Sequence, residues 1–271
     1  MNWKIARGKE NQYMDLSLIR LYHENSKHSP RLVSKNSPIY EKYIQKKNDR
    51  FQYCKEIPSL NDLQKRNSSF LEVRLSDVLI NRKTSWEFDN EISEADLYTF
   101  LQFSFGVNRV NKIIGDDGEE KKTYCRTYPS GGALYPIKIY VYINQVKGMK
   151  AGCFYEFDAT KNQLKLLDDK IENQILNSMT AATDLKFKSY ENAAFFIFLA
   201  LDFLESGRKY GLLSYRLSLL EAGHISQNIM LVATAMKLST VPIGGFFENK
   251  LNKLFQLDTR NETIVYFFPV G

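Results

Sequence analysis

Apolar residues recur at strand spacing in several parts of the chain. In IKIYVYIN (137–144) every second residue is apolar, which predicts a strand with one buried face made of Ile137, Ile139, Val141 and Ile143. A strand buried on both sides is predicted by NAAFFIFLALDF (192–203), which is apolar almost throughout. Two strands joined by a polar turn are expected in GCFYEFDATKNQLKLL (152–167), and a last strand in TIVYFFPVG (263–271).

Helix signals stand between these strands. The clearest is SEADLYTFLQFSFG, where Ser93, Asp96 three residues later and the final Gly106 predict a capping box and a glycine stop. Shorter helices are expected in LSDVLINRK (75–83), in DKIENQILNSM (169–179) and after VPIGGF (241–246). A polar loop with an Asp117–Gly118 turn is predicted over NRVNKIIGDDGEEKK (108–122).

One long helix is predicted from about 208 to 238. Its apolar residues lie on nearly every side: Leu212, Leu213, Leu217, Leu219, Leu220, Ile225, Ile229, Met230 and Val232. A helix that is apolar on most faces is buried in a core or in a subunit interface. The elements together predict an α+β fold, a mixed β-sheet flanked by helices with this long buried helix at its centre.

Charge divides the chain into two parts. Residues 1–70 hold 14 Lys and Arg against 7 Asp and Glu, whereas the remainder is balanced. We therefore expect a basic, mostly helical N-terminal extension over 1–70 and a main domain over 71–271. The extension has the charge to attract an acidic partner, but no nucleic-acid reader motif accompanies it, so no nucleic-acid partner is expected.

Composition and motifs exclude several classes of protein. A hydrophobic content of 44% is enough for a folded core. No apolar run reaches the roughly 18–20 residues of a membrane span and no signal peptide is visible, so a cytoplasmic protein without membrane contact is expected. The three cysteines and three histidines lack metal-ligand spacing, and no dinucleotide or P-loop motif occurs.

Four segments carry residues suited to ligand binding. Arg82 and Lys83 with Thr84 have the charge and hydroxyl to hold a phosphate, although a solvated charge cluster is the simpler reading. Small residues in PSGGALYP (129–136) suit close approach to a flat ring, although alone they describe a turn. Gln227 and Asn228 are singled out because buried amides on an apolar helix need hydrogen-bond partners. Gly244 and Gly245 offer successive backbone N–H donors.

Taken together, the order of Arg82–Thr84, RTYPSGGALYP (126–136), YRLSLLEAGHISQN (215–228) and VPIGGF resembles the FMN-dependent nitroreductase superfamily. More narrowly, it resembles the SagB/McbC-type azoline dehydrogenases, which oxidise thiazolines and oxazolines in ribosomally made peptides. The resemblance covers roughly 70–271, and YHENSK (22–27) is also similar to that group. It implies a nitroreductase-like FMN-binding domain in a homodimer whose flavin sites lie between two subunits.

The resemblance also implies roles for particular residues. Arg82, Lys83 and Thr84 match the FMN phosphate segment, with a departure from the pattern at Trp86. Ser130, Gly131 and Gly132 match residues beside the flavin ring, and Arg126 precedes them where the subgroup also has a basic residue. Gly244 and Gly245 match the backbone donors near flavin N5, and Gln227 and Asn228 join this predicted cofactor site.

Lys209 and Tyr210 favour the azoline dehydrogenases over ordinary reductases. They match a Lys-Tyr pair that these dehydrogenases carry and that nitroreductases do not share. A lysine beside a tyrosine lets the ammonium stabilise a phenolate, so either side chain can serve as the base. The simpler reading is a solvated lysine and a packing aromatic. The implied partners are an azoline-containing precursor peptide and a cyclodehydratase complex. The alternatives are an NAD(P)H-dependent nitro or quinone reductase and a flavin-binding scaffold subunit.

Overall fold

The computed structural model describes residues 21–23, 73–89, 91–114, 120–169, 171 and 192–271. Its centre is a five-stranded sheet in the order β7-β6-β4-β8-β9, with every neighbouring pair antiparallel. The strands are β4 (Ile137–Ile143), β6 (Phe154–Asp158), β7 (Gln163–Asp168), β8 (Phe195–Asp202) and β9 (Glu262–Val270). All five correspond to strands predicted from the sequence, and the α+β class is confirmed.

Parallel pairing is confined to a separate short ladder. Strand β1 (Ile92–Ser93) pairs with β5 (Val146–Lys147) in parallel. The sequence predicts a sheet with mixed strand directions. Parallel pairing is found in the β1–β5 ladder, whereas all described pairs of the central sheet are antiparallel.

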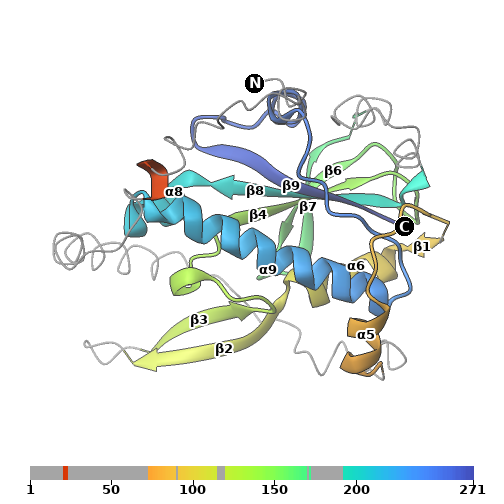
Figure 1. The fold of residues 1–271 in the computed structure, drawn as a ribbon, viewed down its shortest axis with the longest axis horizontal. Helices are drawn as coiled ribbons and strands as arrows, with labels where there is room; N and C mark the ends of the chain where they lie inside the picture. The colour runs from red at the N-terminus through yellow and green to blue at the C-terminus, as the bar shows by residue number, and fades with distance from the viewer. Residues whose placement is uncertain (1–20, 24–72, 90, 115–119, 170, 172–191) are drawn as a thin grey trace, which may run out of the picture.

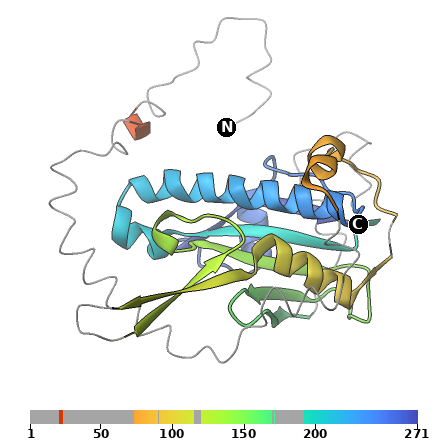
Figure 2. The same ribbon diagram turned by 90° about the horizontal axis from the view of Figure 1, so that it is seen from below.

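Helices cover both faces of the sheet. The alternating residues of β4 divide between two cores, with Ile139 and Val141 in one and Tyr140 and Tyr142 in the other. The first core is completed by α6 (Glu94–Phe105) and α9 (Leu213–Ala235), and Figures 1 and 2 show α9 lying along the sheet. The second core is closed by α10 (Glu248–Leu254), which follows the glycines of VPIGGF.

The capping signals of α6 are confirmed. The Ser93 side chain accepts from the Asp96 backbone N–H at 3.2 Å, and the Asp96 carboxylate accepts from the Ser93 backbone N–H at 3.1 Å. The helix ends at Phe105, and Gly106 is its C-cap. The shorter helix α5 (Leu75–Asn81) is also present where the sequence predicts it.

The predicted polar loop over 108–122 is wrong. Strands β2 (Val107–Ile114) and β3 (Glu120–Arg126) form an antiparallel hairpin there, which projects from the body in Figures 1 and 2. The hairpin depends on pairing between two polar segments, and the composition of either segment alone favours a loop. Its expected turn at Asp117–Gly118 lies outside the described residues.

The long helix predicted from about 208 to 238 is confirmed over most of that range, but the range is not one continuous helix. It is divided at Gly211, whose φ is 54° and ψ is −134°, into α8 (Phe203–Tyr210) and α9. One face of α9 is buried, including Ile225 and Ile229, whereas Leu220 on another side is 56% exposed. Burial on every side is therefore not reached within one chain.

Two further expectations concern residues that are mostly not described. Of the extension over 1–70 the structure describes 21–23, a helical segment whose Tyr22 ring packs edge-on against Tyr215 at 5.7 Å. The division into an extension and a main domain remains a prediction. The helix expected over 169–179 lies outside the described residues, except for Asp169 and Ile171.

Candidate active site

The glycine-bearing turn over 129–136 joins β3 to β4 and has an unusual backbone. It contains a short 3-10 helix, η3 (Gly131–Ala133). The φ angle is +64° at Gly132, +52° at Ala133 and +52° at Tyr135. Glycine adopts this region freely, but the two other residues each cost on the order of 1 kcal/mol or more. Such a conformation persists only where the surroundings hold it.

Hydrogen bonds hold the turn closed. The Ser130 hydroxyl accepts from the Tyr135 backbone N–H at 2.9 Å, and the Ser130 carbonyl accepts from the Ala133 N–H at 3.1 Å. The Tyr135 hydroxyl accepts from the backbone N–H of Arg126 at 2.9 Å, which ties the end of the turn back to β3.

Lys209 and Tyr210 meet this turn from the end of α8. A Cβ built on Gly132 would overlap the Lys209 ammonium and lie 2.6 Å from the Tyr210 hydroxyl. The Lys209 Nζ lies 5.1 Å from the centre of the Tyr210 ring, and Lys209 is 7% exposed. The structure therefore brings together the two segments that the sequence singles out independently, the turn and the Lys-Tyr pair.

Caps and small residues place α8 at the turn. Asp202 ends β8 and caps α8 by accepting from the Leu204 N–H at 2.9 Å and the Glu205 N–H at 3.1 Å. The helix packs closely on α9 because the buried hydroxyls of Ser206 and Ser218 meet at 3.2 Å. The geometry of the Lys-Tyr pair thus follows from the β8–α8–α9 connection.

A buried polar cluster lies behind the turn. Arg126 donates from Nη1 to the Tyr128 hydroxyl at 2.7 Å, and its guanidinium lies 4.5 Å from the Tyr135 ring centre. Burial raises the pKa of Tyr128 to about 12, opposed by the Arg126 charge. Glu221 of α9, which is 3% exposed, accepts a short hydrogen bond from the Ser130 hydroxyl.

Sequence reasoning missed Glu221. It is the sole acidic residue of α9, and it falls among the apolar positions of that helix. A lone carboxylate on an apolar face was the available signal, because a buried charge needs a partner. Arg126 was predicted as a cofactor ligand, and the contacts described for its side chain belong to this cluster.

Gln227 and Asn228 have different surroundings. The Asn228 amide donates to the Ser104 carbonyl at 3.3 Å, which ties α9 to the end of α6. Gln227 is exposed. Their predicted role at the cofactor remains untested.

The predicted phosphate segment lies at the other end of α9. Arg82 caps α5, and Arg82, Lys83 and Thr84 are all exposed. The next residue, Ser85, donates its backbone N–H to the Thr240 carbonyl at 3.2 Å. This contact places the segment beside the start of VPIGGF.

The position of the glycines of VPIGGF can be given relative to that contact. Ile243 bridges Phe267 of β9, whereas Thr240 bridges Val270 three residues further along the strand. The strand rise of about 3.3 Å puts these bridges about 10 Å apart. Gly244 and Gly245 are exposed, and a Cβ on Gly244 would lie 3.7 Å from the Tyr266 ring. The phosphate segment and the two glycines therefore form a second group.

The turn and the phosphate segment are far apart within one chain. The turn contacts α9 at Glu221, whereas the phosphate segment lies beyond Ala235 at the end of the helix. A rise of about 1.5 Å per residue puts these points about 20 Å apart along α9. The turn and the Lys-Tyr pair form one group of predicted site residues, and Arg82–Thr84 with Gly244 and Gly245 form another.

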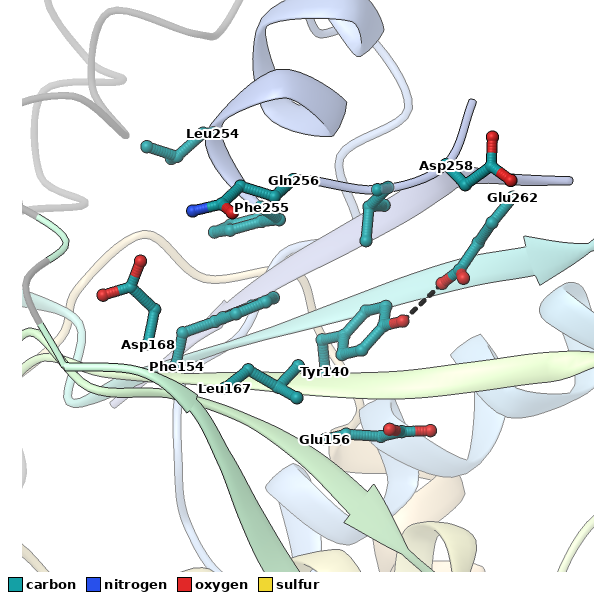
Figure 3. Close-up of a pocket in the computed structure, with 11 residues that line it drawn as sticks. Tyr140, Phe154, Glu156, Leu167, Asp168, Leu254, Phe255, Gln256, Asp258 and Glu262 are labelled. Carbon is teal, nitrogen blue, oxygen red and sulfur yellow. Dashed lines mark hydrogen bonds between the residues drawn. The ribbon is translucent and has the colours of Figure 1, made fainter. Parts of the chain in front are cut away.

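A pocket of about 310 Å³ lies away from both groups, beside α10 (Figure 3). Its lining includes four acidic residues, and Glu262 accepts a short hydrogen bond from the Tyr140 hydroxyl. None of the predicted site residues lines it. In the described part of the chain, no cluster of His, Cys, Asp and Glu suits a metal ion, and no helix is long and apolar enough to cross a membrane.

Comparisons with known proteins agree with this architecture. The model of the nitroreductase family matches residues 81–271. A Methanocaldococcus jannaschii protein named as a nitroreductase is 27% identical over 201 residues, covering 74% of this chain and 91% of the relative. The Escherichia coli microcin B17-processing protein McbC is 27% identical over 197 residues, covering 70% and 71%.

The fold is found again in a solved assembly. A chain of the Escherichia coli microcin synthetase McbBCD complex, with truncated pro-MccB17 bound, matches with a TM-score of 0.57 and 19% identity. The match covers 97% of this chain and 98% of that chain. With a family model that spans most of its length, this chain belongs to the nitroreductase family, a class of flavin oxidoreductases.

Proposed function

We propose that this protein is an FMN-dependent azoline dehydrogenase that oxidises thiazoline or oxazoline rings in a ribosomally made peptide. The observation that carries the proposal is the meeting of Lys209 and Tyr210 at Gly132. It puts an ammonium and a phenol against the turn on which, by resemblance, a flavin ring would lie. A general base needs this proximity to the reacting ring.

The residues present fit FMN. Gly131, Gly132, Gly244 and Gly245 are exposed and leave the backbone open to a flat ring. Arg82 and Lys83 are exposed cations suited to a phosphate monoester. When bound, FMN would supply a hydride acceptor at N5 and pass the electron pair on to oxygen.

Lys209 and Tyr210 would handle the proton. Azoline oxidation removes two hydrogens, a proton from one ring carbon and a hydride from its neighbour. The Tyr210 hydroxyl oxygen or the Lys209 nitrogen would accept the proton once deprotonated, and the hydride would leave on the flavin side. With the two side chains adjacent, the charge of one stabilises the anion of the other.

A complete site would need two copies of the chain. The FMN arm from ring to phosphorus has seven bonds of about 1.5 Å and spans roughly 10 Å, which matches the separation of Gly244 from the Ser85–Thr240 contact. The turn is about 20 Å from the phosphate segment along α9, about twice the length of that arm. We infer that one subunit supplies Arg82–Thr84 and Gly244–Gly245, and that the other supplies the turn with Lys209 and Tyr210.

The relatives support a peptide substrate and a synthetase partner. McbC is named for processing microcin B17, and the matched McbBCD complex holds a truncated pro-peptide. We propose by analogy that this chain acts on an azoline-containing precursor peptide together with a cyclodehydratase. The basic extension over 1–70 is proposed to help dock that peptide or complex.

A flavin reductase of nitro or quinone compounds is the second candidate. It is favoured by the name of the archaeal relative. A scaffold subunit that binds flavin without turnover is the third.

One experiment separates the three. The purified protein is loaded with FMN and incubated with an azoline peptide in air, or with NADPH and a nitroaromatic compound. The proposal expects loss of two hydrogen masses per azoline and slow NADPH oxidation. Fast nitroreduction with intact azolines would instead establish the reductase, and flavin binding without either activity would establish the scaffold.

A further inference from the structure

The carboxylate of Glu221 occupies a costly position. It is 3% exposed on a helix whose other buried residues are apolar or small, and burying a carboxylate is unfavourable unless it is paired and hydrogen-bonded. An aliphatic side chain would pack at this position without that cost. The reason for a carboxylate at position 221 is therefore sought in the polar groups that it contacts.

The group held directly is the Ser130 hydroxyl. A hydroxyl has one proton and two lone pairs, and an ionised carboxylate can only accept. Donation to Glu221 therefore orients the Ser130 oxygen so that a lone pair faces the Tyr135 N–H, which it accepts at 2.9 Å. The cationic guanidinium of Arg126 lies within electrostatic range of the same carboxylate.

The Ser130 contact acts on the strained part of the turn. Ala133 and Tyr135 have left-handed backbone angles, and Gly132 between Ser130 and these residues is the one that meets Lys209 and Tyr210. Release of Ser130 would let the turn relax and move Gly132 away from the pair.

We propose that Glu221 is a positioning residue, which acts through Ser130 to hold the turn at the distance from Lys209 and Tyr210 that proton abstraction requires. This role rests on the proposed azoline chemistry for its effect on rate. Its effect on the turn itself is independent of that chemistry.

The test compares Glu221→Ala, Glu221→Gln and Ser130→Ala with the control Glu262→Gln. Glu262 is a second buried carboxylate, which accepts from the Tyr140 hydroxyl and pairs with Lys138 of β4; neither partner belongs to residues 129–136. Backbone hydrogen exchange over 129–136 is measured by mass spectrometry on the FMN-loaded protein, followed by kcat and KM for the azoline peptide.

Glu221→Ala and Ser130→Ala should exchange about tenfold faster in the turn. Each should lose about tenfold or more in kcat, with KM changed less than about threefold, because a misplaced base affects the transition state more than binding. Glu221→Gln should recover most of the exchange protection, since its amide oxygen still accepts from Ser130. Glu262→Gln should leave exchange in the turn unchanged.

Unchanged exchange in both Glu221→Ala and Ser130→Ala would overturn the proposal. Equal exchange in Glu262→Gln and Glu221→Ala would also overturn it, because the effect would then be general destabilisation. If Glu221→Ala does not fold, Ser130→Ala decides alone. A wild-type protein inactive on azolines would contradict the proposed function, and the exchange result would still decide the role of Glu221.

Discussion

The backbone of Gly132 lies so close to the Lys209 ammonium that no side chain fits between them. The two residues belong to separate elements, the β3–β4 turn and the end of α8, and their contact defines the centre of the proposed site. The same contact brings the Tyr210 hydroxyl against the turn. Any change that separates these two elements should affect the proposed reaction more than it affects the stability of the fold.

Gly132→Ala should destabilise the protein more than Gly131→Ala. The new Cβ at position 132 overlaps Lys209 at a left-handed φ of +64°, whereas at position 131 it meets Leu217 and Tyr210 at ordinary distances of 3.6 and 3.9 Å. We expect a loss of about 1–2 kcal/mol in the free energy of unfolding for Gly132→Ala and a few tenths for Gly131→Ala. Urea denaturation measures both, and equal losses would contradict the close contact.

Lys209→Ala and Tyr210→Phe should lower azoline oxidation by about 10²-fold or more while FMN and the dimer are retained. This is the usual scale for loss of a general base. Arg208→Ala is the control, because Arg208 is an exposed cation one residue away. Steady-state oxidation of an azoline peptide provides the measurement. Near wild-type rates in both variants would show that neither side chain is the base.

Two inactive variants should complement each other when their subunits are mixed. One carries Arg82→Ala with Lys83→Ala, and the other carries Lys209→Ala. If each flavin site takes these groups from different subunits, half of the mixed dimers are heterodimers with one intact site, and about a quarter of wild-type activity returns. No recovery after proven subunit exchange would place both groups in one chain.

Leu220→Asp should weaken the proposed homodimer. Leu220 and Leu219 are 56% and 41% exposed on α9 in the single chain, and a buried interface disfavours an unpaired carboxylate. We expect sedimentation to shift from dimer to monomer at micromolar concentration, with loss of FMN. Leu166→Asp on β7 serves as the control, because Leu166 is 52% exposed, and this variant should remain dimeric. A monomer that still holds FMN would contradict the two-subunit site.

Stability should fall between about pH 10 and pH 12 because of Tyr128. Burial raises its pKa from the usual 10.0 of a tyrosine to about 12, so the unfolded chain releases this proton first as the pH rises. The folded state therefore binds more protons in this window, and its stability falls by up to roughly 1.4 kcal/mol per pH unit. Tyr128→Phe lacks this proton. Its unfolding free energy should fall less between pH 9.5 and 11.5, about 2 kcal/mol less at most, and equal slopes would contradict the buried phenol.

Much of the secondary structure was determined by local sequence alone. The alternation of apolar residues in 137–144 predicted β4, and Ser93, Asp96 and Gly106 predicted both ends of α6. These signals suffice because a strand face or a helix cap is satisfied by residues within a few positions of each other. The glycines and cations of the candidate site were likewise visible as residue types.

Tertiary structure decided what those residues meet. The β2–β3 hairpin needs two polar segments to pair, and the break at Gly211 is hidden because a glycine inside a helix costs only about 1 kcal/mol and leaves the apolar pattern intact. Ser130 and Glu221 are 91 residues apart, and only the packing of α9 on the turn joins them. The sequence by itself determined most of the elements and the chemistry available. Their distances from each other depend on contacts between distant segments, which no local pattern records.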